Sequence, residues 1–316
     1  MLEVLFCNVG DGDAILLTEH SDGRPDFHIL VDTGRPYVEP AEGSRRREAL
    51  YYLKERNIES IDLLILTHLH IDHIGGAMRI LDSVPVKRLE ALFIPPKDAE
   101  WIALPESTEK PLNGFCYALN IFTEIVRKAE SLGCQIEAAK GGTVCMAGNL
   151  FMSTYLPRQD VIDRHIAVAD VLLHKQQPEH DLWYRASKER NLTSLMHRFT
   201  YGSRSVLLTG DRYAADWENE EIGSCDILKL PHHGDPKSMT RSLIGKLHPS
   251  YAVISCQNSP EAKKDRPNAD ILEMLLETVP KVLCTENRKT GNMPASTTNG
   301  IRFTVSDSGS LSCRCE

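Results

Sequence analysis

The 316-residue sequence lacks any hydrophobic run long enough to cross a membrane, and its first residues lack the basic start of a secretory leader. No stretch approaches the roughly 18 apolar residues that a membrane-spanning helix requires. The opening residues, MLEVLFCNVGDGDAILL, instead interrupt short apolar runs with acidic residues. We therefore expect a cytoplasmic protein without a membrane partner.

The sequence also lacks a disulfide framework and an excess of positive charge. Its nine cysteines are odd in number and scattered, as is typical of a chain that is kept reduced. The formal net charge is -8. This charge argues against binding of nucleic acid over a long basic surface, because such binding depends on many Lys and Arg contacts to phosphates. An enzyme that contacts a few phosphates inside a cleft is compatible with it.

No internal repeat and no low-complexity linker divides the chain, and 41% of its residues are hydrophobic, enough for a full core. Strand-like runs bounded by turn residues alternate with helix-like stretches, which predicts an α/β layered fold. A GDGD turn at 10–13 predicts a β-hairpin, and residues 115–132 have the apolar spacing of a helix. We expect one domain over residues 1–316, with the polar segment 158–190 as an insertion or a lid over the active site.

The most informative segment is LLILTHLHIDHIGG, in which three histidines and an aspartate follow an apolar strand within six residues. Side chains alternate along an extended chain, so His68 and His70 point the same way. Asp72 and His73 can reach a second point from the start of the next helix. Imidazoles with a carboxylate suit zinc, manganese or iron, and a site with fewer than four protein ligands leaves room for water. The pattern predicts a metal centre rather than a polar loop that happens to be rich in histidine.

This segment resembles the HxHxDH signature of the metallo-β-lactamase superfamily. Three further segments follow in the superfamily's order, namely VDTG at 31–34, LLTGD at 207–211 and LPHHG at 230–234. The likeness extends over residues 2–306. It implies the metallo-β-lactamase fold, a four-layer αββα sandwich of two mixed sheets flanked by helices, and the activity of a metal-dependent hydrolase.

Within the superfamily, the sequence is most similar to the hydrolase domain of bacterial DNA-uptake (competence) channel proteins and to related phosphodiesterases. The shared segments are NVGDGDAILL at 8–17, NLTSLMHRFTYGSRSVLLTGD at 191–211, DILKLPHHG at 226–234 and HPSYAVIS at 248–255. The sequence departs from the superfamily in lacking the usual third-motif histidine, for which Asn191 is the nearest polar substitute. It departs from this branch in having Asp235 where a serine is usual.

The resemblance implies two divalent metal ions, Zn²⁺ or Mn²⁺. The implied ligands of the first ion are His68, His70 and Asp211, with Asn191 or water completing the site. The implied ligands of the second ion are Asp72, His73, Asp211 and His233. Asp32, in the VDTG segment, would support the metal-binding histidines from behind.

The resemblance also implies catalytic roles for Asp72 and His232. Asp72 would orient a water shared by the two ions, which would act as a metal-bound hydroxide. His232 would face the substrate as an oxyanion stabiliser or as a proton donor to the leaving group. Two alternatives stay open: His232 rather than His233 is the ligand, or His232 is hydrogen-bonded to the backbone.

The metal motif alone does not choose between acyl and phosphoryl substrates. The likeness to the competence branch favours phosphodiesters, as does the missing third-motif histidine, which acyl hydrolases of this fold usually keep. Lys237 and Arg241 follow the HHG motif at i, i+4 spacing and would share one helix face near the metals, where they could bind phosphate. The alternative for both is a solvated surface. Other basic groups are Arg45 to Arg47, Arg185 with Lys188 and Arg190, and Lys263 and Lys264 with Arg266.

We expect a nuclease that acts on single-stranded or flexible DNA or RNA. The first alternative is a phosphodiesterase on a small molecule, such as a cyclic nucleotide or a phosphocholine-type ester, which the acidic net charge favours. A thioester or lactone hydrolase follows, and then a non-catalytic interaction module with a protein partner. His165, His174 and His180, in the polar segment, are candidates for the missing ligand. The sequence does not indicate an oligomeric state.

Overall fold

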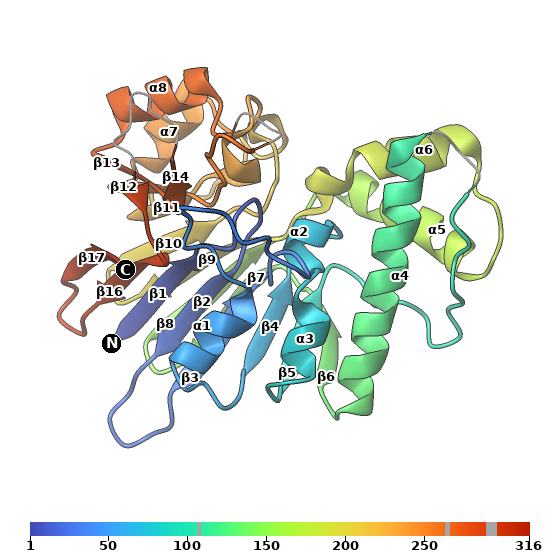
Figure 1. The fold of residues 1–316 in the computed structure, drawn as a ribbon, viewed down its shortest axis with the longest axis horizontal. Helices are drawn as coiled ribbons and strands as arrows, with labels where there is room; N and C mark the ends of the chain where they lie inside the picture. Colours follow the sequence, from blue (N-terminus) through green and yellow to red (C-terminus); the bar gives the residue numbers. More distant parts are fainter. Residues whose placement is uncertain (106–108, 263–265, 289–295) are drawn as a thin grey trace.

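The computed structural model describes residues 1–105, 109–262, 266–288 and 296–316. Two β-sheets pack face to face and helices cover their outer faces, which gives four layers (Figure 1). The predicted sandwich of two mixed sheets flanked by helices is confirmed. In the described part of the chain, no helix is long and apolar enough to cross a membrane.

The first sheet has eight strands in the order β17-β16-β1-β2-β3-β4-β5-β6. The strands are β1 (Leu2–Cys7), β2 (Ile15–Glu19), β3 (Phe27–Val31), β4 (Leu63–Leu66), β5 (Arg88–Ala91), β6 (Gln135–Ala138), β16 (Gly300–Val305) and β17 (Leu311–Cys315). Pairs from β17 to β3 are antiparallel, and pairs from β3 to β6 are parallel. The antiparallel pairing of β1 with β2 confirms the hairpin predicted from the GDGD turn.

The second sheet has seven strands in the order β13-β12-β11-β10-β9-β8-β7. The strands are β7 (Gly142–Ala147), β8 (Leu150–Tyr155), β9 (Met196–Tyr201), β10 (Arg204–Leu208), β11 (Ile227–Lys229), β12 (Tyr251–Ile254) and β13 (Lys281–Cys284). A separate two-stranded sheet joins β14 (Glu286–Asn287) to β15 (Ser296–Thr297). Both large sheets therefore contain a parallel and an antiparallel half.

The helices belong to the two outer layers. The α-helices are α1 (Ala49–Glu55), α2 (Ile71–Ile74), α3 (Ala77–Leu81), α4 (Lys110–Ser131), α5 (Gln159–Leu173), α6 (His180–Lys188), α7 (Arg241–Leu247) and α8 (Ala269–Thr278). Short 3₁₀ turns are η1 (Arg190–Thr193), η2 (Ala214–Asp216) and η3 (Pro231–Gly234). Side chains of α1, α3 and α4 pack on the first sheet, whereas those of α7 and α8 pack on the second.

Strand β4 shows why the metal motif starts where it does. All four of its residues are buried: Leu64 and Leu66 face the helices, while Leu63 and Ile65 face the second sheet. A parallel strand buried on both faces needs a continuous apolar run rather than an alternating one. The run ends at Thr67, where polar side chains can gather at the edge of the sheet.

The segment predicted as an insertion, 158–190, forms α5 and α6, which pack beside α4 at one side of the sandwich (Figure 1). Helix α4 starts at Lys110, five residues before the predicted start, and continues to Ser131. Apolar side chains of α5 and α6, including Leu172 and Trp183, join the core under α4. The segment is thus tied to the first sheet through its own hydrophobic contacts, and its role as a lid stays a prediction.

The burial of His165 on α5 leads to a prediction about acid stability. Its ring lies edge-on to Phe115 of α4, with 4.9 Å between ring centroids. In the described structure its Nε2 has no hydrogen-bond partner. Burial, followed by the neighbouring Arg190 and Arg164, lowers the pKa of His165 from 6.5 to about 3. The unfolded chain therefore takes up this proton first, and stability must fall as the pH decreases from about 6.5 towards 3.

We expect His165→Leu to remove part of the acid sensitivity. Between about pH 7.5 and pH 5, the free energy of unfolding of the wild type should fall by roughly 2 kcal/mol more than that of the variant. Urea unfolding at the two pH values measures the difference. His174→Leu, which removes an exposed histidine just after the same helix, is the control. Equal pH dependence in wild type and His165→Leu would contradict the prediction.

Candidate metal centre

The predicted metal-binding residues meet where strands of both sheets end. His68 and His70 follow β4, and His73 lies on α2. Asp211 comes shortly after β10, and His233 lies in η3 directly after β11. Since these strands end at the same edge of the sandwich, five residues from three distant segments come together.

One oxygen of Asp211 lies at the centre of four imidazoles. Asp211 Oδ2 is 3.3 Å from His73 Nε2 and 3.8 Å from both His68 Nε2 and His233 Nε2. His232 Nε2 lies 3.9 Å from the same oxygen. A carboxylate in this position could serve as a ligand in a two-metal site.

Four groups of side chains place their ligand atoms within 4.8 Å of one another. The first group, His68, His70 and Asp211, has the composition predicted for one metal site. The second, Asp72, His73 and His233, contains three of the four ligands predicted for the other site. It includes His233 and not His232, in agreement with the preferred assignment of the HHG motif.

Hydrogen bonds behind the rings orient the imidazoles. His73 Nδ1 lies 2.7 Å from Asp32 Oδ2, and His233 Nδ1 lies 2.8 Å from the carbonyl oxygen of Ser255. These contacts orient each ring so that its Nε2 faces Asp211; with a metal ion bound, Nδ1 would keep the proton and Nε2 would be the ligand atom. Asp32 also accepts hydrogen bonds from the backbone N–H and the hydroxyl of Thr67, at 2.8 and 2.7 Å. Asp32 therefore lies behind His73, in the position that the resemblance implied.

Most groups of the cluster have the protonation state that metal binding requires, which is a neutral imidazole or an ionised carboxylate. Burial lowers the pKa of His68 and His70 well below 6.5, which keeps both imidazoles neutral. Burial alone would raise the pKa of Asp72, but His73, His233 and Arg35 lower it to about 2, so this carboxylate is ionised. Burial also opposes the charge of His73, yet Asp211 and Asp32 raise its pKa well above 6.5. The carboxylates around His73 thus attract a positive charge.

Comparison with known proteins agrees with this architecture. Residues 8–105 match the model of the metallo-beta-lactamase superfamily, and the remaining strands complete two mixed sheets flanked by helices. The metallo-β-lactamase fold is confirmed. The YhfI protein of Bacillus subtilis, a solved structure of this fold, aligns with a TM-score of 0.49 at 12% identity, covering 90% of this chain and 95% of that protein.

Two curated relatives match most of the chain. ComE operon protein 3 of Bacillus subtilis is 26% identical over 303 residues, which cover 91% of this chain and 32% of that protein. Recombination protein 2 of Haemophilus influenzae is 28% identical over 255 residues, which cover 78% of this chain and 23% of that protein. The metallo-β-lactamase fold described here therefore spans about a third of one relative and about a quarter of the other.

The residues of this metallo-β-lactamase fold suit divalent cations. Within the described residues, His73 Nε2, His233 Nε2 and Asp211 Oδ1 are buried without a hydrogen-bond partner. Buried polar atoms are almost always paired, so nitrogen and oxygen atoms that converge without hydrogen-bond partners have the chemistry of cation ligands. His68 Nε2 and His70 Nδ1 lie 2.9 Å apart, within hydrogen-bond distance, and both belong to the group formed with Asp211.

Asn191, the predicted substitute for the missing histidine, lies beside the cluster. Its Nδ2 donates to the hydroxyl of Tyr213 at 3.0 Å and lies 3.2 Å from His232 Nε2. Its Oδ1 is buried and has no hydrogen-bond partner in the described ranges. An amide oxygen in this position is available as a ligand, and this role of Asn191 stays a prediction.

Among the described residues, the hydrogen-bond partners of the His232 ring are side chains, those of Arg266 and Asn191. His232 Nε2 lies 2.7 Å from Arg266 Nη2, so the ring nitrogen accepts and the guanidinium donates. Burial, opposed by Asp211, lowers the pKa of His232 to about 4, which makes it a neutral acceptor. The structure therefore adds Arg266, which the sequence offered only as one of several basic residues. Lys263 and Lys264, from the same basic group, lie outside the described residues.

The expectation that Lys237 and Arg241 share one helix face was wrong. Helix α7 begins at Arg241, so Lys237 lies in the turn before it. Lys237 Nζ lies 5.6 Å from the ring centroid of Tyr213, beside the cluster, whereas Arg241 pairs with Glu277 of α8. The Thr240 side chain caps the helix at Leu243 N, which starts it four residues after Lys237. Binding of substrate by either residue stays a prediction.

The histidines of the 158–190 segment do not join the cluster. Among the described residues, none of the metal-binding groups includes His165, His174 or His180. The segment contacts the metal motif through Arg190, whose guanidinium donates to the carbonyl oxygen of Leu69 at 3.3 Å. Burial lowers the pKa of Arg190 to about 10, so it stays a cation beside the centre at neutral pH.

Sequence reasoning missed the buried pair of Asp13 and Lys229. Lys229 Nζ forms an ion pair with Asp13 Oδ2, donates to the carbonyl oxygen of Gly210 at 2.9 Å and lies 3.7 Å from Asp211 Oδ1. Asp13 in turn lies 3.8 Å from His73 Nδ1 and 3.9 Å from His233 Nδ1. Asp13 and Lys229 lie in the segments GDGDA and DILK, which both contributed to the family likeness. A lysine within an apolar strand was the sequence feature that could have indicated a buried ion pair.

The GDGD turn itself packs against the metal motif. A Cβ on Gly12 would lie 2.5 Å from the carbonyl oxygen of Asp72, and Asp13 N donates to that oxygen at 3.2 Å. Only glycine permits this close approach. The hairpin between β1 and β2 is therefore part of the wall that supports the metal centre.

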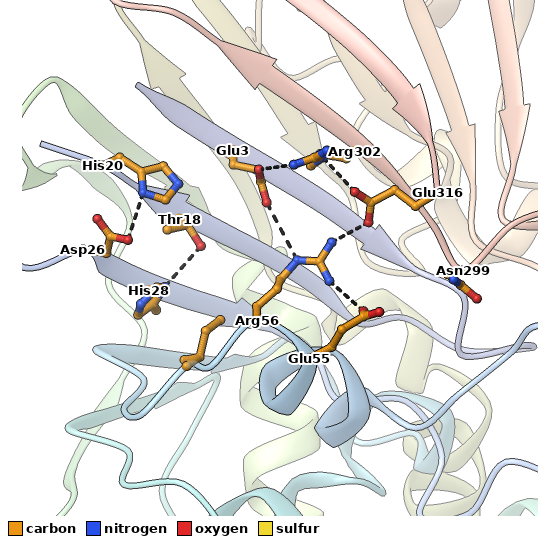
Figure 2. A pocket seen from close by; sticks show the side chains of 11 residues that line it. Glu3, Thr18, His20, Asp26, His28, Glu55, Arg56, Asn299, Arg302 and Glu316 are labelled. Carbon is orange, nitrogen blue, oxygen red and sulfur yellow. Dashed lines mark hydrogen bonds and ion pairs between the residues drawn. The ribbon is translucent and has the colours of Figure 1, made fainter.

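Two pockets differ in their relation to the cluster. The pocket in Figure 2 has a volume of about 470 Å³, lies over β1, β2, β3 and β16 beside the end of α1, and shares no residue with the metal-binding groups. Its arginines, Arg56 and Arg302, are paired with Glu3 and Glu316. A second pocket, of about 520 Å³, includes Arg35, which lies 3.5 Å from Asp72 Oδ2. Only the second adjoins the cluster.

Proposed function

We propose that this protein is a metal-dependent hydrolase of phosphodiester bonds, acting on single-stranded or flexible nucleic acid with Zn²⁺ or Mn²⁺. The observation that carries the proposal is the convergence of imidazoles and carboxylates on Asp211 Oδ2, bordered by arginines. Cations bound there would supply Lewis acidity at a phosphoryl oxygen and lower the pKa of a water molecule. The name of one relative, Recombination protein 2, is compatible with a nucleic-acid substrate.

The arginines favour a phosphoryl over an acyl substrate. Arg35 lies 3.5 Å from Asp72 Oδ2, and Arg266 lies 2.7 Å from His232 Nε2. Both guanidinium groups lie within 4.0 Å of the Asp11 carboxylate. Guanidinium groups match the oxygens of phosphate in geometry and charge. A thioester or a lactone has no anionic oxygens in its ground state for two such groups to bind.

In this proposal, side chains of the protein orient the attacking water and bind the phosphate. Asp72, ionised and 17% exposed, can accept a hydrogen bond from the attacking water and so orient it. Arg266 can donate to a phosphate oxygen, while His232 accepts from Arg266 and holds its guanidinium in place. His232 thus acts through Arg266 in this proposal, whereas the resemblance implied that it faces the substrate as an oxyanion stabiliser or as a proton donor to the leaving group.

We expect metal-dependent cleavage of a fluorescent single-stranded oligonucleotide. Cleavage should require added Mn²⁺ or Zn²⁺, should stop with EDTA, and should fall at least about 100-fold in Asp72→Ala, because the water would lose its orienting carboxylate. Denaturing gel electrophoresis of the products measures the rate.

The control for charge and folding is Asp22→Asn, at an exposed turn residue between β2 and β3. A parallel assay with bis(p-nitrophenyl) phosphate separates a small-molecule phosphodiesterase from a nuclease. Hydrolysis of a thioester or lactone, with neither phosphodiester cleaved by the metal-loaded protein, would contradict the proposal.

A further inference from the structure

The proposed chemistry assigns no role to the pocket that adjoins the metal centre. Four segments line it: the turn between β1 and β2, the loop after β3, the start of α2 and the loop after β12. We propose that this pocket binds the nucleobase of the nucleotide whose phosphate lies at the metal centre. This inference rests on the proposed phosphodiester hydrolysis and names what the site recognises beside the phosphate.

Arg35 and Ile71 connect the pocket to the centre. Both line the pocket. Arg35 Nε donates to the carbonyl oxygen of Asp11 at 3.2 Å, and its Nη2 lies 3.5 Å from Asp72 Oδ2. Ile71 directly precedes Asp72 in the chain. A phosphate near the metals would therefore have Arg35 within reach, and the group attached to that phosphate would extend into the pocket.

The walls of the pocket suit a flat, mostly neutral ring. Val9, Val38 and Ile71 supply apolar surface. Tyr37 also lines the pocket and is 60% exposed, so its ring is accessible for stacking. Bases stack on aromatic side chains whatever their sequence, because every base has a π-face.

The polar groups of the pocket match the edge of a base better than a second phosphate. Gln257 can donate and accept hydrogen bonds, and the exposed carboxylate of Glu39 can accept from an exocyclic amino group. The other pocket cation, Arg46, pairs with Glu286 and Glu261 at 3.5 Å each. Because this charge is already compensated, a further phosphate inside the pocket would meet a net negative wall.

The test compares two ligands that differ only in the base. Isothermal titration calorimetry of the Mn²⁺-loaded protein with adenosine 5′-monophosphate and with ribose 5-phosphate should show roughly 5- to 30-fold tighter binding of the nucleotide. Tyr37→Ala should remove this difference, and Tyr37→Phe should keep it because the ring remains. Tyr117→Ala is the matched control, since Tyr117 is a 44% exposed tyrosine on α4 that lines neither pocket described above.

The outcomes separate the inference from the proposed function. Equal affinity for the two ligands in the wild type would overturn the nucleobase pocket, as would a preference that Tyr37→Ala leaves intact. A preference that depends on Tyr37, in a protein that cleaves no phosphodiester, would support the pocket and overturn the proposed activity alone.

Discussion

Replacing Lys229 by methionine is expected to lower the free energy of unfolding of the metal-free protein by about 3–5 kcal/mol. Lys229 is fully buried, and its Nζ forms an ion pair with the buried carboxylate of Asp13. Methionine keeps much of the volume of the side chain but leaves Asp13 as an uncompensated buried charge. Urea unfolding in the presence of EDTA measures the change.

A double-mutant cycle tests the physical reason. Lys229→Met together with Asp13→Asn should recover at least half of the lost stability, because the second substitution removes the unpaired charge. The matched control is Lys87→Met, which breaks an exposed ion pair with Asp62 and should cost less than about 1 kcal/mol. Strict additivity of the two substitutions at Lys229 and Asp13 would show that the pair does not act as a unit.

Asp211→Asn is expected to weaken metal binding at least roughly 100-fold, with a parallel loss of hydrolysis. Residues that merely support metal ligands contribute 10- to 100-fold, and Asp211 Oδ2 lies at the centre of the cluster itself. Asparagine preserves the size of the side chain and removes its charge. The metal content per chain after gel filtration, determined by mass spectrometry, gives the direct measurement.

The same variant should remain folded, which separates metal loss from misfolding. Asp211 N donates to Ser194 Oγ at 3.1 Å, a backbone contact that the substitution leaves in place. Asp22→Asn, exposed in the turn before β3, should keep both metal and activity. Metal content at the wild-type level in Asp211→Asn would contradict the role of this carboxylate.

Features that depend on neighbouring residues, such as apolar runs and turns, could be predicted from the sequence. The apolar run of β4, followed by three histidines and an aspartate, indicated a buried strand that delivers ligands at its end. The GDGD turn indicated the β1–β2 hairpin. The strand and the hairpin are confirmed, because strand burial and turn chemistry depend on neighbouring residues. The histidines and the aspartate lie together because residues close in sequence share one loop.

The predictions from local sequence failed at the start of one helix and at one buried charge. Lys237 and Arg241 looked like one helix face, but the cap at Thr240 starts the helix after Lys237, and Glu277 of another helix pairs with Arg241. Lys229 was not singled out in the sequence, because its partner Asp13 lies 216 residues earlier in the chain. Spacing along the sequence carries no information about such partners.

Patterns of neighbouring residues were enough to predict the strand before the metal motif, the β1–β2 hairpin and an α/β layered fold, and the resemblance of the motifs implied the superfamily fold. Which residues surround the motif depends on the tertiary structure. It brought Asp211 and His233 from the second sheet to His68 and His73 of the first, set Arg266 against His232, and opened the pocket beside Asp72. The physical reason is that these contacts form only when the two sheets pack on one core and their strand ends meet at one edge.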